Sequence, residues 1–358
     1  MSVAQAGAVV VTITVGTDTV PQDHQASFVV DRDIHQPDMA TIVLYNQDHR
    51  YSKLAVSTEV EIKVSQGGSE VSIYKGEIVG LEPVYRAGEK QRISIRAMNK
   101  FHRLIRKRKS VTFTDKTDQQ ILQQVVSDSG LSLDWKHETS INYKHVYQHN
   151  MTDMEFVRMR AARMGCHVWC VGDTLNVKQP DLQQAPAQTL AIDAAISTQP
   201  QLRGFHPRMS SAPIAKKMTV KGWNPETKQL ITGTASAQPS KLGSQNASDA
   251  SGDMGDEENF TVDHPIWSTE EANAIAKAKL QDAALTYMTG ECECVGDPGY
   301  NIATVVQLNI NTQDSDDVFN GNYYVMGVTH RYVGSGKERD SGYVTHLKLA
   351  RDAQKGKG

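Results

Sequence analysis

A capped helix followed by a short hairpin is the feature that most constrains this chain. Between Gln148 and Trp169, Thr152 and Glu155 have the spacing of a capping box, in which a hydroxyl and a carboxylate each satisfy an unpaired N–H at the start of a helix. Apolar residues then recur at helical spacing, and Gly165 is placed to end the helix. The sequence therefore predicts a helix between Thr152 and Gly165.

A β-hairpin is predicted directly after this helix. Residues 166–171 form a short apolar run typical of a strand, and Gly172-Asp173 offers a turn into residues 174–178. No side chains in this unit are arranged for chemistry. We therefore interpret residues 148–178 as a scaffold.

The first part of the chain, from residue 8 to about 113, predicts an all-β section. Thr58–Val64 alternates charged residues with Val60, Ile62 and Val64, as a strand with one solvent-facing side does. Spacers such as Gln66-Gly67-Gly68 suit hairpin loops. Six short strands at this spacing indicate a barrel or a sandwich. They are expected at residues 9–15, 27–30, 40–45, 59–64, 72–79 and 91–97.

At residue 115 the periodicity changes from strand to helix. Thr117 and Gln120 again have capping-box spacing, and an apolar stripe at helical spacing stops at Gly130. An extended stretch then leads from Leu131 into the capped helix described above. Residues 115–182 therefore predict a compact α+β unit.

From about residue 186 the chain becomes β-rich again. Residues 235–267 interrupt this section, because they lose periodicity, accumulate Asp and Glu and carry no Lys or Arg after Lys241. We expect them to form an exposed acidic excursion. Ser268 and Glu271 then cap a helix that runs to about Met288. Strands are expected at residues 189–192, 217–221, 229–232, 291–295, 304–310, 323–331 and 343–349.

The composition is that of an ordinary globular protein. A chain of 358 residues exceeds what one hydrophobic core supports, so two or three domains are expected. An apolar fraction of 39% and a net charge of −3 argue against a disordered chain, and 6% aromatic residues argue against a broad base-stacking platform. The apolar run Ala8–Val11 is too short to span a bilayer and follows no basic leader, so assembly in the cytoplasm is expected.

The changes of periodicity place the domain boundaries. Residues 1–114 are expected to form a first antiparallel β-barrel, residues 115–185 an α+β insert, and residues 186–358 a second β-barrel. The acidic excursion and its helix lie at about 235–290 within this last domain. The predicted fold class is therefore mainly β with an α+β insert.

Four cysteines in a chain of this length do not make a disulfide framework. Cys166 and Cys170 share one face of a predicted strand, and Cys292 and Cys294 share one face of another. Four thiolates would bind zinc if the two strands met. Because both spacings are looser than the C-x-x-C of structural zinc sites, buried free thiols are the favoured interpretation. No metal or cofactor is expected.

Other catalytic and binding motifs are incomplete. Gly334-Ser335-Gly336-Lys337 ends like a phosphate-binding loop, but the full pattern needs Gly and Ser or Thr where the chain has Arg331 and Glu338. The cluster at Asp314, Asp316 and Asp317 lacks the glycine and closing glutamate of a calcium loop. HExxH and GxSxG do not occur. No catalytic residue is predicted, although an active site assembled from distant residues stays open.

A basic segment, residues 100–109 (KFHRLIRKRK), follows the first β section. It is either an electrostatic patch for nucleic acid or an acidic partner, or the exposed side of a connecting segment with Phe101, Leu104 and Ile105 turned inward. The second interpretation is favoured, because a nearly neutral chain does not suit a dedicated nucleic-acid binder. Docking of a protein partner stays a hypothesis for the basic and acidic clusters, with the candidates Arg103, Arg106, Lys107, Arg108, Lys109, Asp253, Asp256, Glu257 and Glu258.

The order of these parts resembles a known family. Three passages carry the resemblance: FHRLIRKRKSVTFTDKTDQQILQQVVSDSGL at 101–131, QHNMTDMEFVRMRAARMGCHVWCVGDTLNV at 148–177, and the terminal stretch GDPGYNIATVVQLNI with GNYYVMGVTHRYVGSGKERDSGYVTHLKLAR. In order and spacing they are similar to the phage late control protein D family, the baseplate hub of contractile tails. They are similar also to the hub half of the type VI secretion spike protein, valine-glycine repeat protein G.

The resemblance implies a structural hub and not an enzyme. In this family two related tube-like barrels per subunit give a homotrimer six tube-like barrels, so that a pseudo-six-fold ring joins a six-fold tail tube to a three-fold spike. Strands in residues 8–97 and 291–349 would form the ring. Because the sequence ends soon after the second β section, the spike tip is expected on a separate polypeptide. The implied surroundings are the tube and other baseplate proteins of a virion or tail-like particle, without membrane insertion, around a channel for DNA or cargo.

Two other classes stay open. A cell-wall-degrading enzyme of a tail tip would need paired carboxylates in a cleft, at a separation suited to glycoside hydrolysis. A nucleic-acid-binding module would depend on residues 100–109, and its affinity would fall steeply with added salt.

Overall fold

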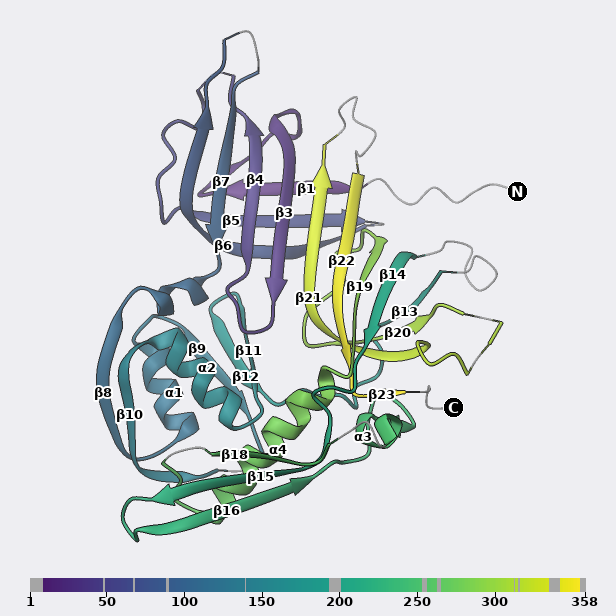
Figure 1. The fold of residues 1–358 in the computed structure, drawn as a ribbon. Helices are drawn as coiled ribbons and strands as arrows, with labels where there is room; N and C mark the ends of the chain where they lie inside the picture. Colours follow the sequence, from purple (N-terminus) through teal and green to yellow (C-terminus); the bar gives the residue numbers. More distant parts are fainter. Residues whose placement is uncertain are drawn as a thin grey trace.

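The computed structural model has a mainly β architecture, as predicted (Figure 1). It describes residues 9–47, 49–66, 68–87, 90–138, 140–192, 201–252, 256–262, 265–311, 313–314, 316–334 and 342–354. In the described part of the chain, no helix is both long and apolar enough to cross a membrane.

Across the described residues, thirteen strands form one sheet that runs through the molecule (Figure 1). Its main path is β14-β19-β22-β21-β3-β4-β7-β6-β5-β1-β2, and β20 attaches β13 to β21. The strands of the first β section are β1 (Val10–Val15), β2 (Asp18–Thr19), β3 (Gln25–Asp33), β4 (Met39–Tyr45), β5 (Glu59–Gln66), β6 (Ser69–Val84) and β7 (Arg92–Met98). Those of the second are β13 (Gln188–Ala191), β14 (Leu202–Met209), β19 (Met288–Val295), β20 (Val305–Asn309), β21 (Gly321–Val333) and β22 (Gly342–Arg351).

The six strands expected before residue 98 are confirmed in the first β section. Alternation holds along β5, where Val60, Ile62 and Val64 are buried and the charged residues between them are not. The long strand β6 turns from one layer to the other, pairing first with β5 and then with β7. Gly76 lies at the bend, where a Cβ would sit 2.5 Å from the Met98 carbonyl oxygen. As a result β1, β5 and β6 lie across β3, β4 and β7 (Figure 1).

One ladder joins the two β sections. β3 pairs antiparallel with β21 from Gly327↔Asp33 to Val333↔Ser27. Tyr343 of β22 is buried in the apolar core of the first section, so that core is completed by the second section. Among the described residues β1 pairs with β2 and β5, and no ladder joins β1 to β3. Closure of each section into a barrel therefore stays a prediction.

The α+β insert confirms both capping boxes. Thr117 Oγ1 accepts a hydrogen bond from the Gln120 N–H at 3.3 Å, and the Gln120 side chain accepts one from the Thr117 N–H. Thr152 and Glu155 form the same two bonds, with 3.1 Å between the Glu155 nitrogen and Thr152 Oγ1. The Gly165 backbone, at φ +63°, follows the second helix. The insert consists of β8 (Arg108–Thr117), α1 (Asp118–Ser127), β9 (Ser132–Lys136), β10 (Asn142–Thr152), α2 (Asp153–Arg163), β11 (His167–Val171) and β12 (Thr174–Lys178).

A buried ion pair fixes the two insert helices against β10. Arg160 Nε donates to Asp118 Oδ1 at 2.6 Å, and the guanidinium lies 4.4 Å from the ring centroid of Tyr143. The Tyr143 hydroxyl donates to the other Asp118 oxygen at 2.8 Å. All three side chains are buried, so the carboxylate and guanidinium have to satisfy each other in place of water.

The prediction of an exposed excursion at residues 235–267 was correct only in part, because Phe260 and Val262 are exposed whereas other residues of the range are buried. Leu242 and Ala247 are buried in the core of the second β section, and β18 (Asp256–Val262) pairs in parallel with β15. The run of acidic residues obscured the strand, although Asn259 to Val262 alternate polar and apolar residues. The remaining elements here are β15 (Ala215–Asn224), β16 (Gln229–Ser236), β17 (Gln245–Asn246), α3 (Ala247–Ser251) and β23 (Ala353–Gln354).

The helix after this range is capped by Ser268, as predicted, but it ends earlier than expected. Helix α4 (Thr269–Leu285) is followed by a short turn, and Met288 already begins β19. Gly290 lies inside β19, where the Phe205 ring covers it. Helix α4 packs on β15 and β16 to form a fourth apolar core among the described residues, beside those of the two β sections and the insert.

Gly233 provides a test of this packing. A Cβ at this position of β16 would lie 2.4 Å from the Ala272 carbonyl carbon and the Asn273 nitrogen of α4. We expect Gly233→Ala to destabilise the protein by about 1–3 kcal/mol, the range for overpacking a tight contact, as measured by urea unfolding.

The matched control is Gly204→Ala in β14, where a Cβ would meet no atom within 4 Å. This substitution should change the free energy of unfolding by less than about 0.5 kcal/mol. Equal losses for the two variants would contradict the close approach of α4 to β16.

Candidate functional site

The basic segment 100–109 is held inward by a buried carboxylate. Glu77 of β6 is 3% exposed and receives two hydrogen bonds from Arg103, at 3.0 Å from Nε and 2.7 Å from Nη2. These hydrogen bonds from Arg103 are the main reason why the pKa of Glu77 lies below its usual value of 4.5, and the charges of Arg103, His102 and Arg106 act in the same direction. The pair anchors the 3-10 helix Lys100–Ile105 to the first β section.

The middle of the segment is more exposed than the sequence indicated. Phe101 and Leu104 are buried as predicted, but Ile105 is 46% exposed, so the expectation that it turns inward was wrong. Arg106 contacts His102, with 2.8 Å between Nη2 and Nε2. Lys107 is exposed to solvent.

The end of the segment, on β8, contacts the start of α2. Arg108 Nη2 donates to Glu155 Oε1 at 2.9 Å, and Lys109 Nζ lies 2.7 Å from Asp153 Oδ2. Both carboxylates are in the first turn of α2, where the helix dipole also favours them. Most of the candidate basic residues thus connect parts of this chain, and their role in docking a partner stays a proposal.

The acidic candidates are only partly described. Asp253 lies outside the described residues, and the backbones of Asp256 and Glu257 belong to β18. Glu258 accepts a hydrogen bond from the Thr219 hydroxyl at 2.5 Å and lies 3.2 Å from Lys217 Nζ. The one acidic candidate with a described side chain is therefore paired with β15 of its own chain.

The four cysteines do not form a common metal set. Cys166 and Cys170 are buried in the insert core, whereas Cys292 and Cys294 are buried in the core of the second β section. The zinc alternative was therefore wrong for these four thiols. Burial raises the pKa of Cys166 and of Cys170 to about 12. In the segment that ends like a phosphate-binding loop, Gly334 is described, and residues 335–337 lie outside the described residues.

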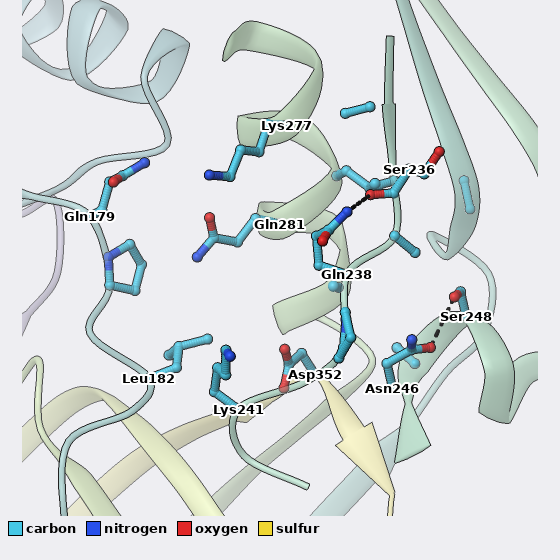
Figure 2. Close-up of a pocket in the computed structure, with 18 of the residues that line it drawn as sticks. Gln179, Leu182, Ser236, Gln238, Lys241, Asn246, Ser248, Lys277, Gln281 and Asp352 are labelled. Atoms are coloured by element: carbon cyan, nitrogen blue, oxygen red, sulfur yellow. Dashed lines mark hydrogen bonds between the residues drawn. The ribbon is translucent and has the colours of Figure 1, made fainter. Parts of the chain in front are cut away.

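A cleft of about 1140 Å³ lies where the insert, α4 and the second β section meet. Figure 2 shows Lys277 and Gln281 of α4 pointing into it, opposite Gln179 and Lys241. Lys277 Nζ donates to Glu138 Oε2 at 3.2 Å. Such amide and ammonium groups can hydrogen-bond a polar ligand. The lining residues come from widely separated segments, so no local sequence pattern could have identified them.

A second cleft, of about 530 Å³, contains a pair of histidines. The rings of His35 and His167 meet edge to face with centroids 5.2 Å apart, and His167 Nδ1 lies 3.2 Å from the Tyr324 hydroxyl. Burial lowers the pKa of His35 to about 4 and that of His167 to about 3. In the part of the chain that the structure describes, no three His, Cys, Asp or Glu side chains are grouped to hold a metal ion.

The ends of the large sheet are the remaining candidate contact surfaces. Along its path β14 and the two-residue β2 are the terminal strands, each paired on one side within the described residues. β14 was not predicted from the sequence, because Pro207 and the bulge next to Gly204 hide its strand pattern. The unpaired backbone N–H and C=O groups of such edge strands can pair with a strand of a neighbouring subunit.

Comparison with known proteins identifies the fold. The sequence profile of the family described as the Alg8 N-terminal domain matches residues 5–333. No curated protein matches the sequence. Among solved structures, a tail protein from Neisseria meningitidis MC58 is 15% identical, with a TM-score of 0.69 over 96% of each chain.

Two further structures share this fold. The 43 kDa tail protein of prophage MuSo2 from Shewanella oneidensis is 14% identical, with a TM-score of 0.68 over 97% of this chain and 100% of that one. A component of the type VI secretion system of Escherichia coli, described as similar to tail proteins of bacteriophage T4, is 12% identical, with a TM-score of 0.59 over 95% of this chain and 76% of that one. The chain therefore has a tail-protein fold along nearly its whole length.

The Glu77 pair leads to a prediction about stability. Arg103→Met should cost about 1–3 kcal/mol at pH 7, because it leaves a buried carboxylate without its main partner. The folded-state pKa of Glu77 is depressed, so this stabilisation is present above pH 4.5 and is lost as the pH falls through the folded-state pKa. Urea unfolding of both proteins at pH 7 and pH 3.5 should show the difference shrinking in acid.

The control for this prediction is Lys107→Met, which removes an exposed charge from the same segment. It should stay within about 0.5 kcal/mol of the wild type at both pH values. A larger loss for Lys107→Met than for Arg103→Met would contradict the structural role of the Arg103–Glu77 pair.

A second pH effect should come from His330, which is fully buried 2.7 Å from the Tyr343 hydroxyl. Burial lowers its pKa to about 3, so the unfolded chain binds a proton below pH 6.5 that the folded chain does not. Stability should fall between pH 6.5 and 4, and this slope should be smaller in His330→Gln. The exposed His149→Gln variant should keep the wild-type slope, and equal slopes in all three proteins would contradict the assignment.

Proposed function

This chain belongs to the family of the Alg8 N-terminal domain, and we propose that it is the baseplate hub of a contractile phage tail or of a related injection machine. The observation that carries the proposal is the match of the tail-protein fold over 96% of both chains. The passages at 101–131 and 148–177 support membership of the late control protein D group of hubs. The type VI secretion component with the same fold is consistent with that group.

In the proposed assembly three copies of the chain form a ring. Each copy would contribute two β sections. Three copies would therefore offer six β sections to a six-fold tail tube and three identical faces to a spike. The β3–β21 ladder supports this arrangement, because it fixes the two β sections of one chain relative to each other. The terminal strands β14 and β2 lie at opposite ends of the sheet path, so a closed ring would also cover both edges.

The proposed partners follow from this position. The hub would contact the tube protein on one side and a separate spike protein on the other, with further baseplate proteins around it. It would reside in a virion or tail-like particle, and DNA or cargo would pass through its central channel. The role is mechanical and needs no catalytic residue, so we propose that the chain is not an enzyme.

The stoichiometry can be measured directly. Light scattering should give a mass of three subunits of 39.5 kDa each, and negative-stain electron microscopy of the same sample should show a ring with a pseudo-six-fold outline. The spike protein encoded with this chain is added in a parallel sample, because a hub that trimerises only on its spike would form the ring there. A monomer in both samples at the highest concentration tested would contradict the proposed function.

A further inference from the structure

The outer face of the sheet β16-β15-β18 carries a group of exposed apolar side chains at one end, beside polar residues such as Thr232 and Thr234. Trp223 of β15 lies opposite Leu230 of β16, and Phe260 and Val262 of β18 lie opposite Thr219 and Lys221. Directly paired residues share a face, so these side chains lie on one surface. Trp223 and Phe260 are 52% exposed, and Leu230 and Val262 are 62% exposed.

This exposure does not arise from a missing part of the core. The inner face of the same sheet packs on α4, where Val220 and Ile275 are buried and Gly233 touches the helix backbone. The outer face is therefore a second apolar surface on a sheet that already has its core. Contiguous apolar patches on a folded protein mark sites of interaction, and aromatic residues are enriched at such sites.

The charges around the patch indicate what fits it. Lys221 lies at its centre, with its ammonium 4.9 Å from the centroid of the Phe260 ring. The neighbouring Lys217 is paired with Glu258 at 3.2 Å. The charge of Lys221 also helps to lower the pKa of Glu258, after the hydrogen bonds from Thr219 and Lys217, but among the described side chains Lys221 forms no ion pair of its own. A carboxylate placed over the patch would pair with Lys221 in surroundings that its apolar neighbours shield from water.

We propose that this face docks a partner protein whose contact surface is apolar and carries a carboxylate opposite Lys221. Packing of two such faces about a two-fold axis fits less well, because it would bring the two central Lys221 ammoniums together, and the sedimentation experiment below tests contact of this face with a different surface of a second copy. The β16-β15-β18 sheet lies at the end of the molecule opposite β1 to β7 (Figure 1). The inference rests on this sheet alone and does not depend on the proposed hub function.

A set of matched peptides tests the proposal. The probe is a fluorescein-labelled nonapeptide in which Leu, Val, Asp, Val and Leu alternate with Thr, so that one face of the extended peptide is apolar with a central carboxylate. Two control peptides carry Asn or Lys in place of Asp. Fluorescence anisotropy with the full chain should show the Asp peptide binding about threefold to tenfold more tightly than the Lys peptide.

Variants of the protein separate the contribution of the apolar side chains to peptide binding from that of the Lys221 charge. Trp223→Ser should weaken binding of the Asp peptide by about tenfold or more, since a central aromatic residue is removed. Lys221→Met keeps an apolar stem and should make the affinities for the three peptides equal. Val56→Ser, which removes an exposed apolar side chain outside this sheet, should leave binding unchanged. Equal affinities of the Asp and Lys peptides for the wild type, or equal binding by Trp223→Ser and wild type, would overturn the proposal.

Two further measurements identify the alternative occupants. Sedimentation velocity should give the same oligomeric mass for wild type and Trp223→Ser, and loss of an oligomer in the variant would assign the face to a second copy. Vesicles of phosphatidylcholine and phosphatidylglycerol should not co-sediment with the wild type. Vesicle binding that Trp223→Ser abolishes would assign the face to a lipid surface and overturn the proposal.

Discussion

The pairing of β3 with β21 is the interaction on which the rest of the structure depends. The ladder brings together strands from the two ends of the sequence, and side chains reinforce it on both faces. Lys348 Nζ lies 2.7 Å from Asp33 Oδ2, and the rings of Phe28 and Tyr332 stack with centroids 5.4 Å apart. Because the same strands also fill the core of the first β section, the two sections cannot move independently without exposing apolar surface.

The insert is attached to this sheet at two places. The Arg103–Glu77 pair holds the segment that enters the insert, and the His35 N–H donates to the Val168 carbonyl at 2.6 Å. On the opposite side Arg163 of α2 donates to the buried Glu271 of α4 at 2.7 Å. The insert and the β16-β15-β18 sheet are thus fixed to the same framework. A hub that transmits force between a tube and a spike would need such rigidity.

Local patterns in the sequence predicted the local structure well. The Thr152–Glu155 capping box was recognisable because its two bonds join residues three apart, and β5 because charged and apolar residues alternate along it. β18 was missed because acidic residues dominate its start, and the charge of one of them, Glu258, is paired with Thr219 and Lys217 of a strand about forty residues earlier. No pattern within the sequence of β18 predicts its pairing with β15.

The candidate docking residues illustrate the same limit. Five basic residues between Arg103 and Lys109 form an obvious cluster in the sequence, yet most of them contact carboxylates of this chain, on β6 and α2. The apolar outer face around Trp223 was not recognised, because its members lie on three strands that only the fold brings together. Sequence clusters of charge therefore overestimate docking surfaces when tertiary partners are not known.

The most direct test of the hub assignment is electron cryo-microscopy of the tail-like particle from the host that encodes this chain. If the chain is the hub, density for three copies of the fold will lie between the last ring of the tube and the spike, with both β sections of each copy lining the channel. A particle whose tube–spike junction is built from another protein, with this chain absent or located elsewhere, would contradict the hub assignment.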